Sequence, residues 1–265
     1  MYETNYQRAS SVDDAAARFA KGKEAKYLAG GQTLLPVMKQ RLASPSDVID
    51  LSKLADLIGC SGTPGGVRIG AATTHYDVAR DATITKAIPA ICDLASQIGD
   101  PAVRYRGTIG GSLANNDPAA DYPAAVLALN ATIKTNKRTI ASDDFFKGLF
   151  TTALEDGEII TAVDFPLADK AGYAKFRHPA SRFALTGVFV AKKGGDVRVA
   201  AVGASQNGVM RVPAIEAALK ANWSASAIDS VKISADGMLS DLHGSSDYRA
   251  NLVKVMAQRA VAAAK

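Results

Sequence analysis

Apolar residues in the N-terminal part of the chain alternate between helical and strand-like spacing. Residues 11–21 carry one apolar helical face behind Ser11, a residue type that caps helix N-termini; this face holds Val12, Ala15, Ala16 and Phe19. Residues 26–29 and 48–51 are short apolar runs typical of strands, and residues 34–42 between them have helical spacing. This order of strand, helix and strand predicts a parallel crossover unit.

Strands and helices of mixed order continue through the middle of the chain, with strands expected at 67–70, 131–134 and 159–165 and helices at 76–81, 88–98 and 119–129. After residue 170 the pattern changes. Two strands at 186–192 and 197–202 flank Gly194-Gly195 as in a hairpin, and a long helix is expected over 246–265. The sequence therefore predicts an α+β protein with a domain boundary near residue 170.

Composition narrows the class of protein. The chain has 265 residues, of which 48% are hydrophobic and 22% charged, so it can bury a sizeable core. Its net charge of +5 comes from Lys and Arg scattered among Asp and Glu, without a basic run. This pattern disfavours nucleic-acid binding and is compatible with an anionic ligand.

The cellular setting is indicated by the cysteines and by the lack of apolar segments. The N-terminus has no signal-peptide pattern, and no apolar run approaches the roughly 20 residues of a transmembrane helix. Cys60 and Cys92 could form one disulfide, but two buried free thiols are favoured. We therefore expect a reduced, cytoplasmic protein without a transmembrane segment.

The pair Gly30-Gly31 lies between an expected strand and an expected helix. This geometry points several backbone N–H groups and a positive helix end at one place, where a pyrophosphate can bind. Glycine allows the close approach and the left-handed dihedrals, and Thr33 adds a hydroxyl donor. A tight turn without any ligand explains the spacing equally well. The G-x-G-x-x-G pattern is absent, which disfavours nicotinamide binding in the usual fold.

A second loop of this kind is expected at Thr108-Ile109-Gly110-Gly111-Ser112, so two Gly-Gly loops can hold two parts of one extended ligand. Asp117 precedes Pro118 and is a helix N-cap candidate, and Asp121 lies four residues further on, on the same helical face. Asp121 is suited either to accept hydrogen bonds from ligand hydroxyls or to complement a helix dipole.

Metal and nucleophile chemistry are not indicated. His75, His178 and His243 are far apart and have no second ligand at metal spacing. Two cysteines cannot supply the four thiolates of an iron–sulfur cluster. No nucleophile motif such as G-x-S-x-G is present. The sequence therefore predicts no metal site and identifies no catalytic residue.

These segments together resemble a known family, the medium, FAD-binding subunit of the molybdenum hydroxylases of the carbon monoxide dehydrogenase and xanthine dehydrogenase type. In the first half the resemblance lies in residues 27–36, 38–39, 41–42, 49–51, 70–71, 73–75, 108–112 and 117–121. In the second half it lies in residues 175–176, 181–184, 202–203, 211–214, 241–244, 248–249 and 259–260. It covers nearly the whole chain.

The resemblance implies a fold in two parts. Residues 1–170 would form a two-lobed FAD-binding domain of p-cresol methylhydroxylase type, with lobes over about 1–55 and 56–170. Residues 171–265 would form a small antiparallel sheet with helices.

It also implies non-covalent FAD contacts. The pyrophosphate would be wrapped by Leu28, Ala29, Gly30, Gly31, Gln32, Thr33, Leu34 and Leu35. Thr108, Ile109, Gly110, Gly111 and Ser112 would contact the isoalloxazine and ribityl side. Asp121 would hydrogen-bond FAD, and Ile160 with either Lys175 or Arg177 would touch the ring or its edge. Thr74 is also expected at the cofactor.

The function that follows from the resemblance is electron transfer. A large molybdopterin-binding subunit would oxidise the substrate, a small [2Fe-2S] subunit would pass electrons to FAD, and an external acceptor would receive them. One alternative is a stand-alone flavin oxidase or reductase acting on a small molecule. Another is a scaffold that has lost FAD.

Overall fold

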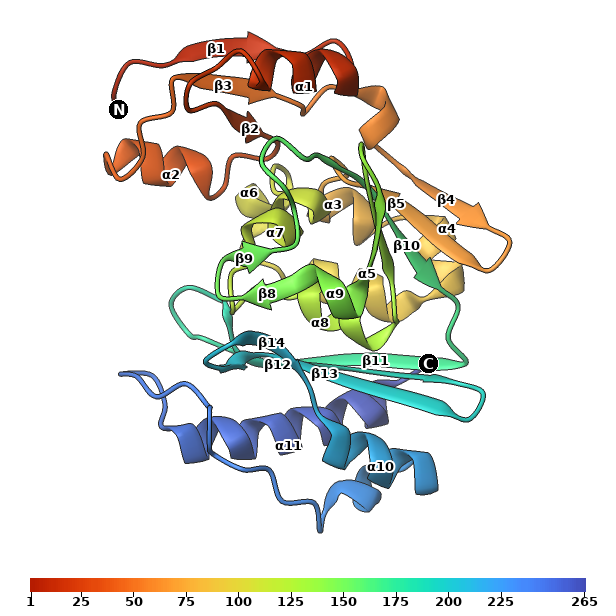
Figure 1. Cartoon of the computed structure of the whole chain (residues 1–265). Coiled ribbons are helices and arrows are strands. Elements are labelled where there is room, and N and C mark those ends of the chain that lie inside the picture. The colour runs from red at the N-terminus through yellow and green to blue at the C-terminus, as the bar shows by residue number, and fades with distance from the viewer.

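The computed structural model describes residues 1–265 as three stacked layers (Figure 1). The top layer is a three-stranded parallel sheet of order β1-β3-β2, with β1 at Asn5–Arg8, β2 at Lys26–Leu28 and β3 at Asp47–Asp50. Helices α1 (Val12–Phe19) and α2 (Leu34–Lys39) connect these strands. The predicted crossover unit is confirmed, and β1 is an additional strand that the pattern did not reveal.

The middle layer is a five-stranded antiparallel sheet of order β4-β5-β10-β6-β7. Its strands are β4 Cys60–Thr63, β5 Gly66–Gly70, β6 Thr132–Thr135, β7 Thr139–Ala141 and β10 Ile160–Pro166. Short helices surround it: α3 His75–Val78, α4 Ala82–Ala87, α5 Pro89–Ser96, α6 Pro101–Arg104, α7 Ile109–Asn115, α8 Tyr122–Ala128 and α9 Ser142–Phe145. A small hairpin pairs β8 (Phe146–Gly148) with β9 (Thr151–Thr152), and the 3-10 turn η1 (Ala55–Leu57) connects the first two layers.

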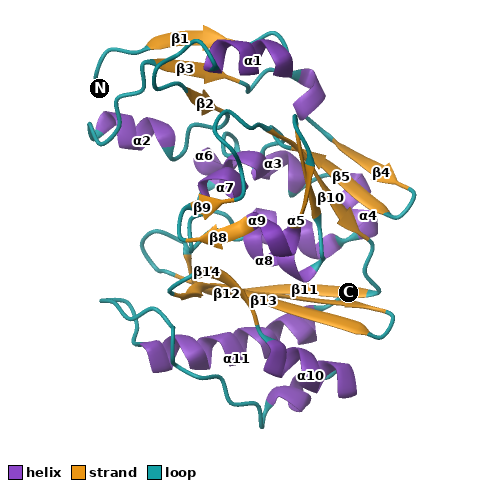
Figure 2. Ribbon diagram, viewed as in Figure 1, coloured by secondary structure: helices purple, strands orange, loops and turns teal.

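The bottom layer is a four-stranded antiparallel sheet of order β11-β12-β13-β14. Its strands are β11 Lys170–Arg177, β12 Ala184–Lys193, β13 Asp196–Ser205 and β14 Gly208–Arg211. The predicted hairpin and the long C-terminal helix are both present, the helix as α11 (Ser246–Ala263). Helices α10 (Pro213–Ala221) and α11 cover one face of this sheet, near the short turn η2 (Ala225–Ile228), and α8 packs on the other (Figure 2).

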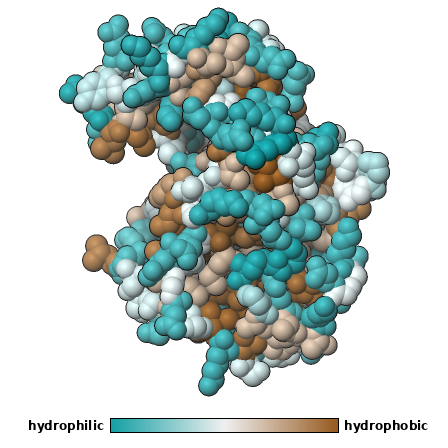
Figure 3. Space-filling view, in the orientation of Figure 1, coloured by the Kyte–Doolittle hydropathy of each residue, from teal (hydrophilic) through white to brown (hydrophobic).

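The largest hydrophobic core joins the lower two layers. It runs from Ile69 and Ile133 in the middle sheet through α8 to Tyr173 and Phe189 in the bottom sheet. A smaller core around Ile49 joins the top layer to Ala72 and Ile159, which flank strands of the middle sheet. The molecular surface is notched between the top layer and the rest (Figure 3). A ligand site between the layers is therefore built by two layers that a small core connects.

Three local predictions were wrong. Gly110 and Gly111 lie in the first turn of α7 and not in a loop, because Thr108 caps a helix there. Asp117 does not cap α8, which begins at Tyr122; the Asp117 carboxylate instead accepts from the Ala119 N–H within a turn, so Asp117 and Asp121 share no helical face. His178 and His243 are far apart only in sequence, since their ring nitrogens Nε2 and Nδ1 lie 3.2 Å apart.

Candidate functional site

A cavity of about 700 Å³ lies between the top layer and the two layers below. The top layer contributes residues 26–34, and the middle layer contributes residues from 71–75, 107–121 and 158–160. The bottom layer reaches it with Lys175, Ser181 and Phe183. All three layers therefore contribute to the lining of one cavity.

The first Gly-Gly segment presents a row of unpaired donors to this cavity. No backbone or side-chain acceptor of the chain bonds to the N–H groups from Ala29 to Leu34; the first paired N–H is that of Leu35, to the Gly31 carbonyl. Thr33 holds the N-cap position of α2 without a capping hydrogen bond. Unpaired N–H groups at the start of a helix favour an anion. The segment thus fits the pyrophosphate of a dinucleotide.

Gly30 and Gly31 have different roles in this segment. Gly31 has φ +73°, a left-handed conformation that glycine adopts without strain. Gly30 lies against the middle layer, where an added Cβ would sit 2.0 Å from the Arg106 carbonyl oxygen. At Gly30 the top and middle layers therefore approach each other backbone to backbone.

The second Gly-Gly segment offers few free donors. The Gly110 N–H bonds to the Ala71 carbonyl at 2.8 Å, and the Gly111 N–H bonds to the Thr108 hydroxyl at 3.1 Å. A Cβ on Gly110 would lie 2.7 Å from Ala71. These glycines let α7 approach β5 and shape the cavity wall, and they do not add a second cradle of N–H groups.

A buried ionic cluster forms another part of the wall. The Asp121 carboxylate accepts from Tyr173 Oη at 2.5 Å and from Lys175 Nζ at 2.9 Å, and Lys175 also donates to the Gln97 carbonyl. The Lys175 side chain is fully buried. Burial raises the pKa of Asp121, while Lys175 and Tyr173 oppose this effect. The cluster holds a cation and an anion beside the cavity, in reach of polar ligand groups.

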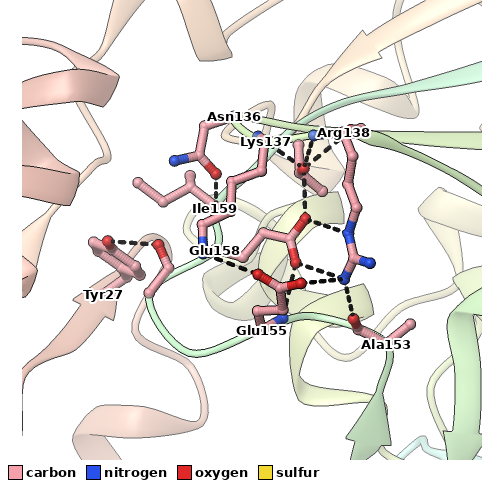
Figure 4. A network of polar contacts seen from close by, with 10 residues as sticks. Tyr27, Asn136, Lys137, Arg138, Ala153, Glu155, Glu158 and Ile159 are labelled. Atoms are coloured by element: carbon pink, nitrogen blue, oxygen red, sulfur yellow. Dashed lines mark hydrogen bonds and ion pairs between the residues drawn. The ribbon is translucent and has the colours of Figure 1, made fainter.

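Glu158, another residue of the cavity lining, is held by a network of polar contacts (Figure 4). Its carboxylate accepts from Arg138 at 3.0 Å and 3.1 Å and from Thr135 at 2.7 Å. Burial alone would raise the pKa of Glu158, but these hydrogen bonds and one from the Glu155 N–H hold it at about 2. The next residue back, Gly157, accepts from the Tyr27 hydroxyl, which ties this loop to the top layer.

The structure brings most of the expected cofactor residues to this one cavity. The residues that line it are Leu28, Ala29, Gly30, Gly31, Gln32, Thr33, Leu34, Thr108, Gly110, Gly111, Ser112, Asp121, Ile160 and Lys175. Four others lie away from its lining. Leu35 packs on Gly31, and Thr74 caps α3. Ile109 is fully buried, and Arg177 is exposed and donates to Gln97.

Several lining residues were not expected from the sequence, among them His75, Gly107, Glu158, Ser181 and Phe183. His75 directly follows the expected Thr74, but only the fold turns its side chain inward. No group of His, Cys, Asp and Glu side chains is arranged to hold a metal ion. Both cysteines carry free thiols, with Cys92 buried. None of the helices combines the length and the hydropathy needed to traverse a bilayer.

Comparison with known proteins gives a consistent result along the chain. Residues 2–168 match a family described as the FAD binding domain in molybdopterin dehydrogenase. The chain is 34% identical to the nicotine 6-hydroxylase medium subunit of Paenarthrobacter nicotinovorans, over 97% of this chain and 95% of that one. It is also 34% identical to the carbon monoxide dehydrogenase medium chain of Afipia carboxidovorans, covering 98% and 96%.

Solved structures give the same picture. A chain of the Cu,Mo-CO dehydrogenase superposes with a TM-score of 0.88 at 30% identity, over 99% of this chain and 98% of that one. A chain of quinoline 2-oxidoreductase from Pseudomonas putida 86 superposes with a TM-score of 0.87 at 28% identity, covering 98% and 96%. The similarity extends through the bottom layer, beyond the residues that the family description matches.

Proposed function

The chain belongs to the FAD-binding, medium-subunit family of the molybdenum hydroxylases, and on that premise we propose that it takes electrons from a [2Fe-2S] partner subunit and passes them through FAD to an external acceptor. The observation that carries this proposal is the row of unpaired N–H groups from Ala29 to Leu34, facing a cavity that all three layers share. The pyrophosphate of a bound dinucleotide would accept from these donors, and the rest of the dinucleotide would lie in the shared cavity.

The chain's own residues bind and orient the cofactor. FAD supplies the redox chemistry, because it can accept and release electrons. The N–H groups of residues 29–34 would hold its pyrophosphate, with the close contact at Gly30 keeping the top layer in place. The Asp121–Lys175 pair would receive polar groups at another part of the cavity, and Thr108 and Ser112 would line it between.

The partners are inferred from the relatives. Those with which this chain is 34% identical over nearly its full length are named medium subunit or medium chain. We propose that this chain assembles with two partner chains, a large subunit that carries molybdopterin and a small subunit that carries the [2Fe-2S] cluster. A reducing cytoplasmic setting is part of the proposal, and the two free thiols support it.

The test is to purify the chain both alone and from its native source. Alone, the full chain should bind FAD in a one-to-one ratio, become reduced by dithionite and oxidise no substrate. From the native source it should co-purify with a molybdenum subunit and an iron–sulfur subunit. Substrate turnover by the isolated chain would contradict the subunit assignment and favour a stand-alone flavin oxidase or reductase. A chain that binds no added FAD would contradict the proposal altogether.

A further inference from the structure

His75 is a buried histidine in the cavity wall that the proposed binding of FAD does not yet use. It is the first residue of α3, it is 5% exposed, and it lines the cavity together with Gly107. Its ring packs beside that of Tyr122, with centroids 5.4 Å apart. Both ring nitrogens of a buried histidine are polar, and each is expected to have a hydrogen-bond partner.

One nitrogen, Nδ1, is fully buried and has no hydrogen-bond partner in the chain. A buried N–H without an acceptor costs more than a buried lone pair without a donor, so the proton of the neutral ring belongs on the other nitrogen, Nε2. The ring stays neutral near neutral pH, because burial and the nearby Arg104 charge lower the pKa of His75 to about 4. Packing thus makes Nε2 a hydrogen-bond donor.

The donor nitrogen lies at the edge of the cavity. A Cβ added to Gly107 would sit 2.6 Å from Nε2, so the missing side chain at Gly107 is what leaves this nitrogen uncovered. The Gly107 carbonyl accepts the His75 backbone N–H at 2.9 Å, and no atom of the chain accepts a hydrogen bond from Nε2. Water can accept from Nε2 while the cavity is empty, and a polar atom of a ligand can take its place when the cavity is filled.

We propose that the Nε2–H group of His75 donates a hydrogen bond to an acceptor atom of the bound FAD. The proposal rests on the binding of FAD by this chain and assigns a cofactor-positioning role to a residue outside both Gly-Gly segments. The alternative is that His75 only fills space against Tyr122, in which case a leucine of similar volume would serve equally well.

Two variants of the full chain separate these alternatives. His75→Gln keeps an N–H donor near the position of Nε2, and His75→Leu removes it. FAD titrations followed by flavin fluorescence should show about tenfold weaker binding for His75→Leu, as expected for one lost hydrogen bond, and a change of less than about threefold for His75→Gln. His243→Leu, at an exposed histidine outside the cavity, is the control and should bind like the original chain.

Equal affinities in His75→Leu and the original chain would overturn the proposal, as would equal losses in His75→Leu and His75→Gln. If the leucine variant does not fold, nitrogen NMR of the unsubstituted chain decides. The ring should carry its proton on Nε2, and that signal should shift when FAD is added. A proton on Nδ1, or a signal that FAD leaves unchanged, would also overturn it. Failure of the unsubstituted chain to bind FAD would instead contradict the proposed function.

Discussion

Gly30-Gly31 and Gly110-Gly111 look alike in sequence, since one residue separates each pair from a threonine and a helix starts nearby, but their backbone groups are used differently in the folded chain. The first pair belongs to a stretch whose N–H groups, from Ala29 to Leu34, have no partner. The N–H groups of the second pair are bonded to Ala71 and Thr108. A Gly-Gly pair therefore marks a close backbone approach, and only the surrounding hydrogen bonds decide whether it also offers donors to a ligand.

The two pairs also differ in what they approach. Gly30 of the top layer lies against the Arg106 carbonyl of the middle layer, whereas Gly110 lies against Ala71, which belongs to the large core. Substitutions at the first site should affect the assembly of the cavity, and those at the second the stability of the fold.

The largest effect is expected for Gly30→Ala. Its Cβ would lie 2.0 Å from a backbone oxygen, so the top layer must move away from the middle layer. We expect FAD affinity to fall about 100-fold, or about 2.7 kcal/mol, in a titration of the full chain. Gly62→Ala, where a Cβ meets nothing within 4 Å, is the matched control. An affinity within about threefold of the original would show that the contact at Gly30 is not needed.

Gly110→Ala should instead lower the free energy of unfolding. Alanine in a helix gains up to about 1 kcal/mol over glycine, but overpacking a rigid core costs about 1–3 kcal/mol. Because the clash is with both the Cβ and the carbonyl oxygen of Ala71, we expect overpacking to dominate, with a net loss of about 2 kcal/mol. Urea unfolding of the FAD-free chain measures it. If Gly110→Ala left stability unchanged and abolished FAD binding, Gly110 would serve the cofactor and not the fold, contrary to the role we give it.

A smaller loss is expected for Thr108→Val. The substitution removes the hydroxyl that accepts the Gly111 N–H and so removes the cap of α7. Loss of an N-cap costs about 1 kcal/mol, again measured by urea unfolding. Ser11→Ala removes the equivalent cap of α1, away from the cavity, and should cost a similar amount. A much larger loss of FAD binding in Thr108→Val than in Ser11→Ala would indicate that the threonine hydroxyl also serves the cofactor.

The smallest effect is expected for Gly111→Ala. Its Cβ would meet the Thr108 hydroxyl at 3.1 Å and Ala29 at 4.0 Å, which are contacts that small shifts relieve. The helical gain of alanine offsets this, so stability should change by less than about 0.5 kcal/mol, and FAD affinity by less than about threefold. A tenfold loss of FAD affinity would mean that the cofactor lies directly on this glycine.

Local elements were the most predictable part of the fold. Ser11 caps α1, and the Gly194-Gly195 hairpin and the C-terminal helix lie where the periodicity places them. Strands β1 and β11 were missed, because neither has a clean alternation of apolar and polar residues. β1 is an edge strand of the top layer, and β11 contributes side chains to two different cores. The helix expected at 76–81 is shorter, because α3 ends at Val78, and the short helix α4 that Asp81 caps was missed.

The candidate site, too, could be predicted only in part from the sequence. The resemblance of the two Gly-Gly segments to a flavoprotein family could be recognised from the chain alone, and so could Asp121 and Lys175 as candidates. Their partnership could not, because the residues lie 54 positions apart and meet only when the bottom sheet packs on α8. His75 gave no signal of its own, since burial and an unpartnered nitrogen are properties of its surroundings.

The sequence by itself determined where helices begin, where the backbone can bend left-handed at Gly31, and which family the chain resembles, because these depend on residues close together in the chain. The tertiary structure alone decided which N–H groups stay unpaired, which carboxylate is buried against a lysine, and which way a histidine faces. Hydrogen-bond satisfaction and desolvation are set by neighbours distant in sequence, so these properties exist only once the three layers have come together.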